Sequence, residues 1–185
     1  MGIGTLIIFI AIVLVAAVAA SVIVSTAYVL QQQAQDTADQ AIAEVSTGFR
    51  IVDVFGTRLN QTNTAIQVVY VKLGLMSGSS PINFQDVVIE IDDGFTEANL
   101  VLGSTANTTC FNITSLRDRE PLNTPGMYFV TSGDLLMVRL NVSEIGLSLQ
   151  PQTQVTMKII PKHGIPNYER FTTPSAYTNV IMDLI

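Results

Sequence analysis

The sequence predicts an α+β protein, in which a long N-terminal α-helix precedes an immunoglobulin-like antiparallel β-sandwich or partly open barrel. Residues 1–35 carry no charged side chain, so all 9 Lys and Arg and all 15 Asp and Glu lie beyond them. After Gly48 the chain changes to short runs of β-branched and aromatic residues, separated by Gly, Pro, Asn, Asp and Ser. Such runs are typical of antiparallel strands and turns. We therefore expect two parts, a helix over residues 1–48 and an outer β-domain over residues 49–185.

Residues 3–30 predict a helix that is apolar on every side. These 28 residues include no charge and no proline, and 16 of them are Ile, Val, Leu or Phe. A helix of this kind must be surrounded by lipid or by other protein. Each buried large apolar side chain contributes about 1.5 to 3 kcal/mol, so exposing the whole segment to water would cost on the order of tens of kcal/mol. A monomer that leaves this helix in water is therefore not expected.

The helix is predicted to continue as an amphipathic segment and to end near Gly48. Polar Gln residues follow Leu30, and the acidic side chains Asp36 and Asp39 lie away from a single apolar stripe. Glycine is a common residue at the C-terminal end of a helix. The stripe is formed by Ala34, Ala38, Ala41, Ile42, Val45 and Phe49.

Three interpretations of the apolar segment are open from composition alone. A cleaved secretory signal would use the small residues at positions 17–19, but the run is longer than the roughly 7 to 15 residues of a signal core. A permanent membrane anchor fits the length, since about 42 Å of helix exceeds the roughly 30 Å bilayer core. Its usual basic anchors are missing, because the first basic residue is Arg50. Frequent Ala and Ser favour the third interpretation, a helix packed closely among copies of itself.

Three stretches of the N-terminal part are distinctive, namely residues 2–20 (GIGTLIIFIAIVLVAAVAA), 30–33 (LQQQ) and 44–48 (EVSTG). These stretches resemble the N-terminal part of mature archaellins, the subunits of archaeal flagella. In the second part, residues 80–83 (SPIN) and 87–91 (VVIEI) look like the start of the family's head domain. Many pilins of the wider superfamily carry a Glu near position five, whereas this chain has no acid before Asp36, which agrees with an archaellin.

The resemblance implies a structural subunit of an extracellular, cell-surface filament used for swimming. It also implies a short basic leader, removed by a prepilin-type peptidase, and leaves open whether Met1 is the first mature residue. The expected partners are further copies of the chain, the membrane before assembly, and the archaellum export and motor machinery. The residues expected to form the polymerisation core are Ile3, Leu6, Ile7, Phe9, Ile10, Val13, Leu14, Ala17, Ala20 and Val24.

Alternation of apolar and polar residues predicts strands with one buried face in the second part. Val155, Met157 and Ile159 alternate with polar residues, and a second alternating run covers residues 135–142. The strands are expected near 49–55, 64–74, 86–92, 98–102, 108–113, 126–131, 135–142, 153–160, 167–173 and 178–184, with no helix between them. Cys110 is expected to be a small buried hydrophobe in one of these strands, since a single cysteine forms no internal disulfide.

Four Asn-X-Ser/Thr sequences mark candidate sites of N-glycosylation. None lies in the first 59 residues, and a glycan must sit on a solvated surface. Chance is the alternative explanation in a chain rich in Asn, Ser and Thr. The candidates are Asn60, Asn107, Asn112 and Asn141.

The composition argues against an enzyme and against a nucleic-acid-binding protein. The net charge is −6 and no cluster of Lys or Arg is present, whereas nucleic-acid affinity depends on basic side chains. The single histidine, His163, lies in a segment bracketed by Pro161 and Pro166, so we expect it in a solvated loop. No phosphate-binding glycine motif occurs. We therefore expect no catalytic residue, no cofactor and no small-molecule substrate.

Residues 91–94 (IDDG), with Glu97 nearby, offer carboxylates that Ca²⁺ would accept. An Asp-Gly turn of a β-hairpin explains the same residues more simply. We therefore expect no metal site here.

Two rival functions remain open at this level. An adhesion pilus subunit would be built in the same way, and a membrane-anchored binding module would keep its helix in the bilayer.

Overall fold

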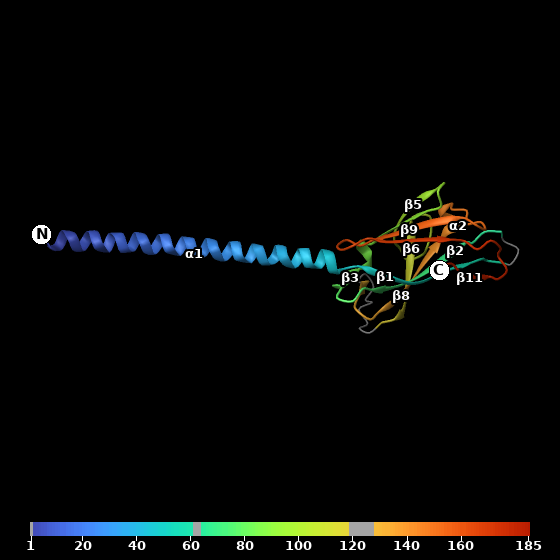
Figure 1. Cartoon of the computed structure of the whole chain (residues 1–185), viewed down its shortest axis with the longest axis horizontal. Coiled ribbons are helices and arrows are strands. Elements are labelled where there is room, and N and C mark those ends of the chain that lie inside the picture. Colours follow the sequence, from blue (N-terminus) through green and yellow to red (C-terminus); the bar gives the residue numbers. More distant parts are fainter. Residues whose placement is uncertain (1, 61–63, 119–127) are drawn as a thin grey trace. The chain divides into compact units, whose positions relative to one another are not determined.

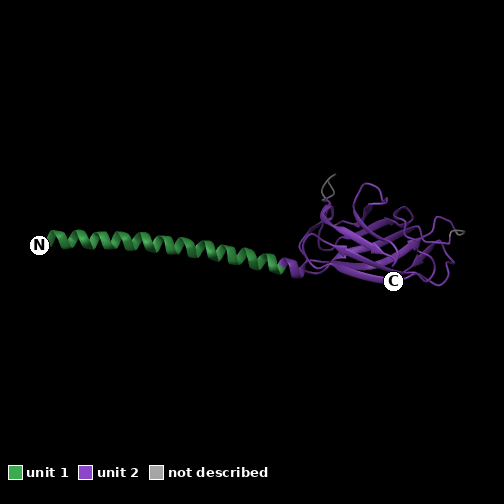
Figure 2. Cartoon of the chain, turned by 90° about the horizontal axis from the view of Figure 1, so that it is seen from above, with its two compact units in different colours: residues 1–42 green, residues 43–185 purple. Residues whose placement is uncertain are grey.

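The computed structural model describes residues 2–60, 64–118 and 128–185 of the chain. It divides into two compact units, Met1–Ile42 and Ala43–Ile185 (Figure 2). The predicted fold class is confirmed, because a long N-terminal helix is followed by a curled, mostly antiparallel β-sheet.

The N-terminal helix, α1, spans Gly2–Ser46 as one uninterrupted element of 45 residues (Figure 1). Its first part has the length and composition of a membrane-crossing helix. No residue of α1 is buried within the described chain. The helix ends two residues before Gly48, which is extended and takes part in a β-bridge instead of capping the helix.

The second unit is built from strands with two short helical turns between them. The turn η1 (Phe84–Asp86) precedes β4, and α2 (Val142–Ile145) follows β8. The strands are β1 (Phe49–Thr57), β2 (Val68–Leu75), β3 (Ile82–Asn83), β4 (Val88–Asp92), β5 (Glu97–Leu102), β6 (Cys110–Arg117), β7 (Phe129–Val130), β8 (Leu135–Asn141), β9 (Gln154–Ile160), β10 (Asn167–Thr172) and β11 (Ile181–Asp183).

Nine of these strands form one sheet in the order β10-β9-β4-β5-β6-β8-β2-β1-β11. All neighbours are antiparallel except β5 and β6, which run parallel. The sheet curls on itself, since Gly48, just before β1, forms a bridge with Ile165, just before β10. Asn167 Nδ2 also donates to the carbonyl oxygen of Phe49 at 2.8 Å. These two contacts bring β10, at one edge of the sheet, against β1, which lies next to the other edge, and so close one end of the barrel.

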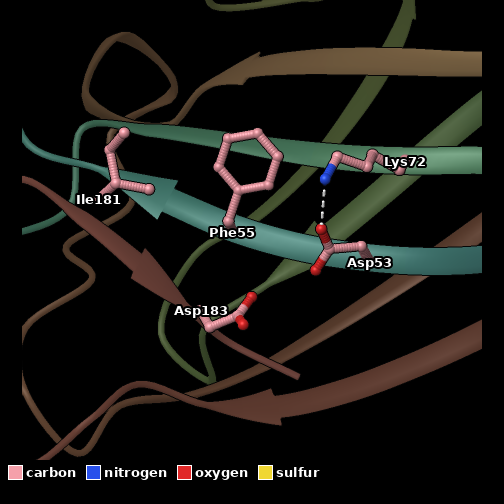
Figure 3. A pocket seen from close by; sticks show the side chains of 5 residues that line it. All are labelled: Asp53, Phe55, Lys72, Ile181 and Asp183. Atoms are coloured by element: carbon pink, nitrogen blue, oxygen red, sulfur yellow. Dashed lines mark hydrogen bonds and ion pairs between the residues drawn. The ribbon is translucent and has the colours of Figure 1, made fainter. Parts of the chain in front are cut away.

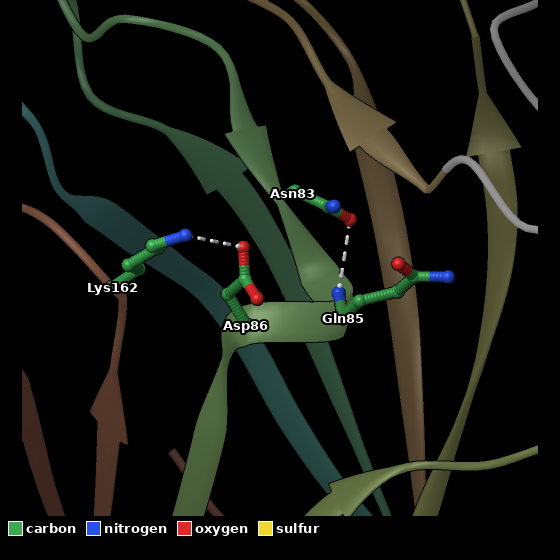
Figure 4. A network of polar contacts seen from close by, with 4 residues as sticks. All are labelled: Asn83, Gln85, Asp86 and Lys162. Atoms are coloured by element: carbon green, nitrogen blue, oxygen red, sulfur yellow. Dashed lines mark hydrogen bonds and ion pairs between the residues drawn. The ribbon is translucent and has the colours of Figure 1, made fainter.

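The small ribbon of β3 and β7 is tied to η1 (Figure 4). Asn83 caps η1, because its Oδ1 accepts a hydrogen bond from the backbone N–H of Gln85 at 3.1 Å. Lys162 Nζ lies 3.4 Å from Asp86 Oδ2, which links η1 to the loop before β10. Both ionic side chains are largely exposed, so this pair adds little stability.

Apolar side chains from both halves of the sheet meet in a single core. Phe49, Phe84 and Phe111 are fully buried, with ring centroids 5.2 Å apart for the first two and 6.4 Å for the last two. The predicted alternation is confirmed, since Val155, Met157 and Ile159 are all buried while the polar residues between them are not. Strand β8 alternates in the same way.

Three details differ from the sequence-based expectations. Helical turns do occur between strands, and α2 forms because Val142 and Ile145 both reach the core from one turn that ends at Gly146 in the left-handed conformation (φ +92°). The pair β5–β6 is parallel. Cys110 is only partly buried, because it is the first residue of β6 and stands beside Gly103 at the sheet surface. His163 is exposed in a loop, as expected.

Candidate assembly site on the helix and at its junction with the head

All ten residues predicted to form the polymerisation core lie on α1. Eight of them are large hydrophobes, and their exposed fractions run from 49% at Val13 to 79% at Ile3. Their spacing of mostly three and four residues places them along one broad side of the helix. The structure therefore aligns them on one element, and within the described chain none of them is covered.

The opposite side of α1 is equally apolar, and sequence reasoning did not include it in the core. Ile8, Ile12, Val15 and Val18 are exposed by 61% to 70%. The all-round apolar composition of the segment already predicted that this side would be apolar too. A helix with both sides apolar needs apolar surroundings on more than one side, so a simple helix pair would leave half of this surface in water.

The threonine hydroxyl groups of the apolar part of α1 form hydrogen bonds within the helix itself. Thr5 Oγ1 donates to the carbonyl oxygen of Gly2 at 2.9 Å, and Thr26 Oγ1 donates to that of Val22 at 2.8 Å. This local bonding satisfies each hydroxyl donor without a partner from another element. These threonines are therefore compatible with an apolar environment.

The two residues that follow α1, Thr47 and Gly48, belong to the second unit and are held there by backbone hydrogen bonds. The N–H of Ile165 donates to the carbonyl oxygen of Thr47 at 2.9 Å, and the N–H of Met76 donates to that of Gly48 at 3.0 Å. Ser79 Oγ accepts from the N–H of Gly48 at 3.0 Å. Two loops of the head therefore hold the two residues that follow the helix. Only the tertiary structure shows this junction, because its parts are far apart in sequence.

Gly164 permits the close approach at the junction. Its φ is +108°, and a Cβ at this position would overlap with the carbonyl oxygen of Thr47. Any side chain here would displace the loop that carries Ile165. The hydroxyl Oγ1 of Thr47 is buried and has no hydrogen-bond partner in the described chain.

The segment considered for calcium forms the hairpin turn between β4 and β5. Asp92 Oδ1 accepts from the N–H of Gly94 at 2.7 Å. Asp93 Oδ1 accepts from the N–H groups of Phe95 and Thr96 at 2.9 and 2.8 Å. Asp93 Oδ2 accepts from the N–H of Ser148 at 3.3 Å, which ties the turn to the neighbouring loop. These oxygens bind backbone donors, and among the described residues no cluster of three metal-binding side chains occurs.

The carboxyl group of Asp93 is stabilised in its ionised form. Burial, taken alone, would raise its pKa, but the backbone N–H groups of Thr96, Phe95 and Ser148 outweigh burial and hold the pKa below the usual value. The charged form therefore contributes to the stability of the folded head.

The four candidate glycosylation sites differ in how their side chains are held. Asn60 is exposed. Asn107 Oδ1 accepts from the backbone N–H groups of Thr109 and Cys110. Asn112 Nδ2, the atom that a glycan would occupy, donates to the carbonyl oxygen of Ser104 at 2.8 Å. At the fourth site, Asn141 Oδ1 accepts from Ser143 Oγ at 3.0 Å.

The family model of archaeal-type flagellin matches residues 1–171, which include both α1 and most of the head. The chain belongs to the archaeal-type flagellin family. Flagellin B2 of Methanocaldococcus jannaschii is 36% identical over 96% of this chain and 89% of its own length. Flagellin B5 of Pyrococcus abyssi is 32% identical over 99% of this chain and 97% of its own length.

Solved structures of archaeal flagellins share the fold. The archaeal flagellum of Methanospirillum hungatei has a TM-score of 0.72 at 15% identity and covers 100% of this chain and 99% of its own. The crystal structure of flagellin FlaB1 from Methanocaldococcus jannaschii has a TM-score of 0.67 at 18% identity, over 75% of this chain and 96% of its own.

As an archaeal-type flagellin, the chain is a structural subunit of the extracellular flagellar filament that serves motility. The family match favours this function over the adhesion pilus and the membrane-anchored binding module.

Substituting Gly164 by Ala is expected to destabilise the head more than substituting Gly78 by Ala. Both glycines have positive φ, but only Gly164 also meets a backbone atom, whereas a Cβ at Gly78 would enter open space. We expect about 1 to 2 kcal/mol of destabilisation for Gly78→Ala and about 1 to 3 kcal/mol more for Gly164→Ala. Denaturant unfolding of the full chain in detergent measures the difference, and equal values would contradict the close approach.

The head is expected to lose stability at acidic pH through Asp93. Because its folded-state pKa is depressed, the stabilisation is complete above the unfolded-state pKa of about 3.9 and is lost as the pH falls through the lower folded-state pKa. Asp93→Asn should flatten this part of the curve of unfolding free energy against pH. Glu97→Gln, which removes an exposed acid of the same hairpin, is the matched control.

Proposed function

We propose that polymerisation buries the apolar part of α1 among the α1 helices of neighbouring subunits. The observation that carries the proposal is that this helix is uncharged through residue 35 and apolar on all sides. Copies of the same helix supply the surroundings that it requires, and their Ala and Ser residues permit close packing. Residues 1–48 then form the filament core and the helix-to-head connection, with the ten predicted core residues and Val15 in the interior.

The outer shell of the filament is formed by residues 49–185 in this proposal. All charged side chains lie from Asp36 onward, and 12 of the 15 acidic residues lie in the β-domain itself. A charged and polar surface remains soluble when it faces water. The bonds that fix Thr47 and Gly48 to two loops of the head would pass force between the core and the shell.

Before assembly, α1 rests in the membrane, because its length and composition suit a bilayer. Extraction into the filament then exchanges lipid for neighbouring helices, so the apolar surface is never transferred to water. The archaellum export machinery performs this transfer, and the motor at the filament base supplies rotation. These are partners of the assembled organelle.

The chain acts without catalysis, a cofactor, a small-molecule substrate or nucleic acid. Its single histidine, His163, lies exposed in a loop, and the chain is acidic. Its role is mechanical. A head-to-tail interface whose rotation does not close generates an open helical filament, so one subunit type is sufficient to build it.

Placing a charge in the apolar run is expected to abolish filaments. In Val15→Asp an unpaired carboxylate would be buried among neighbouring helices, which costs several kcal/mol for each subunit. Electron microscopy of the cell surface, with an immunoblot of the membrane fraction, should show subunits in the membrane but no filaments. Gln33→Asp places the same charge on the polar part of the helix and should preserve filaments. Normal filaments from Val15→Asp would contradict burial of this helix.

We also propose that the head carries N-glycans and that Asn112 is the least favourable acceptor. Its Nδ2 is held by a backbone carbonyl group, whereas Asn60 is exposed and Asn107 and Asn141 are held through their Oδ1 atoms. Intact-mass measurement of subunits should show one glycan fewer in Asn→Gln variants at one or more of the other three sites. Asn112→Gln should change the mass only by the substitution. An unglycosylated wild-type subunit would refute the proposal.

A further inference from the structure

The sequence of α1 supplies none of the usual means of ending a helix at Ser46. Neither Thr47 nor Gly48 adopts the left-handed conformation with which many helices end, since neither has a positive φ. No basic residue lies in the last turn to bond its free carbonyl groups, and the acidic Glu44 lies there instead. A carboxylate is unfavourable beside the negative end of the helix dipole. The last turn would therefore fray if it depended on its own residues.

The head supplies a cap from a residue 33 positions further along the chain. Ser79 Oγ lies 3.2 Å from the carbonyl oxygen of Ser46 and 3.1 Å from that of Gly48, and its single proton can be donated to either oxygen. The same Oγ accepts from the N–H of Gly48 at 3.0 Å. One hydroxyl group therefore acts as donor and as acceptor for backbone groups on both sides of Thr47.

The turn that carries Ser79 lies closely against Gly48. The N–H of Ser79 donates to the carbonyl oxygen of Met76 at 3.2 Å, and Gly78 within this turn has a φ of +86°. Met76 donates its own N–H to the carbonyl oxygen of Gly48 at 3.0 Å. A Cβ at Gly48 would lie only 3.0 Å from Met76 Sδ. The absence of a side chain at Gly48 therefore lets this turn hold the Ser79 hydroxyl against the end of the helix.

Strand β1, which begins directly after Gly48, is held on the sheet by side-chain contacts of its own (Figure 3). Lys72 Nζ, on β2, lies 2.6 Å from Asp53 Oδ2 and 5.0 Å from the centre of the Phe55 ring. Phe55 also stacks on Tyr70, with ring centroids 5.0 Å apart. Together with two residues of β11, the first three side chains border an open surface hollow of about 340 Å³. The strand is thus held without Ser79, so loss of the hydroxyl should act on the helix end.

We propose that the hydroxyl group of Ser79 is the C-terminal cap of α1 and that this cap stiffens the joint at residues 46–48 in the filament. This role rests on the proposed function, because force passes through the joint only when subunits are polymerised through α1. Without the hydroxyl group, the N–H of Gly48 and the carbonyl oxygen of Ser46 would bond to water, and the last turn would open more often. The head would keep its fold, because Ser79 is not part of the apolar core.

Hydrogen exchange of full-length subunits in detergent tests the cap, with mass spectrometry of peptides that cover residues 43–49. In Ser79→Ala this segment should exchange about fivefold faster than in the wild type, as expected for the loss of one hydrogen bond. Ser77→Ala is the matched control. Ser77 lies in the same turn and is exposed, and its hydroxyl forms no hydrogen bond in the described chain. The amides of β8 and β9 should keep their wild-type protection in both variants.

Two results of the exchange measurement would overturn the proposal. An unchanged exchange rate at residues 43–49 would show that Ser79 does not cap the helix. Faster exchange throughout the head would show that Ser79 stabilises the head as a whole and not the end of α1.

Electron microscopy of filaments measures the stiffness of the joint. Filaments of Ser79→Ala should assemble and have a shorter persistence length than wild-type filaments, whereas Ser77→Ala filaments should match the wild type. Equal persistence lengths for all three, or a complete loss of filaments in Ser79→Ala, would overturn this role of the cap. If wild-type subunits formed no filaments, polymerisation itself would be refuted, and the exchange measurement would still decide whether Ser79 caps α1.

Discussion

The free-energy cost of exposing α1 to water constrains every other part of this protein. A helix of 45 residues that begins without charge, and of which no residue is buried by the described part of the chain, requires an apolar environment from outside the chain. Lipid and sister helices are the two environments that meet this requirement. The proposed order, membrane residence followed by polymerisation, would use both in turn and would keep the apolar surface away from water throughout.

The head has a different requirement, because it must be stable in water while it is attached to such a helix. Its curled sheet closes on one core that contains the tilted rings of Phe49, Phe84 and Phe111, and no described residue of α1 is buried in that core. The two residues after the helix enter this closed sheet beside Gly164. Because Gly164 has no Cβ, its backbone can lie close to the carbonyl oxygen of Thr47. The helix and the head are therefore stabilised separately and joined by a short, well-bonded segment.

Sequence patterns were sufficient to predict the elements whose burial is periodic. Strands β8 and β9 follow the alternation of their side chains, and α1 follows from an unbroken apolar run. The short turn α2 and the parallel pair β5–β6 escaped prediction, because each depends on which strand lies alongside and not on local pattern. For the same reason Cys110 was expected to be buried but stands at the edge of the core.

The sequence by itself determined the family, the fold class and the presence of a long apolar N-terminal helix. These depend on composition and on contiguous residues, which need no spatial information. Only the tertiary structure showed that Ser79 and Ile165 hold the residues after the helix, and that Phe55 and Ile181 line one hollow. Long-range strand pairing brings these residues together, and no local periodicity specifies which strands pair.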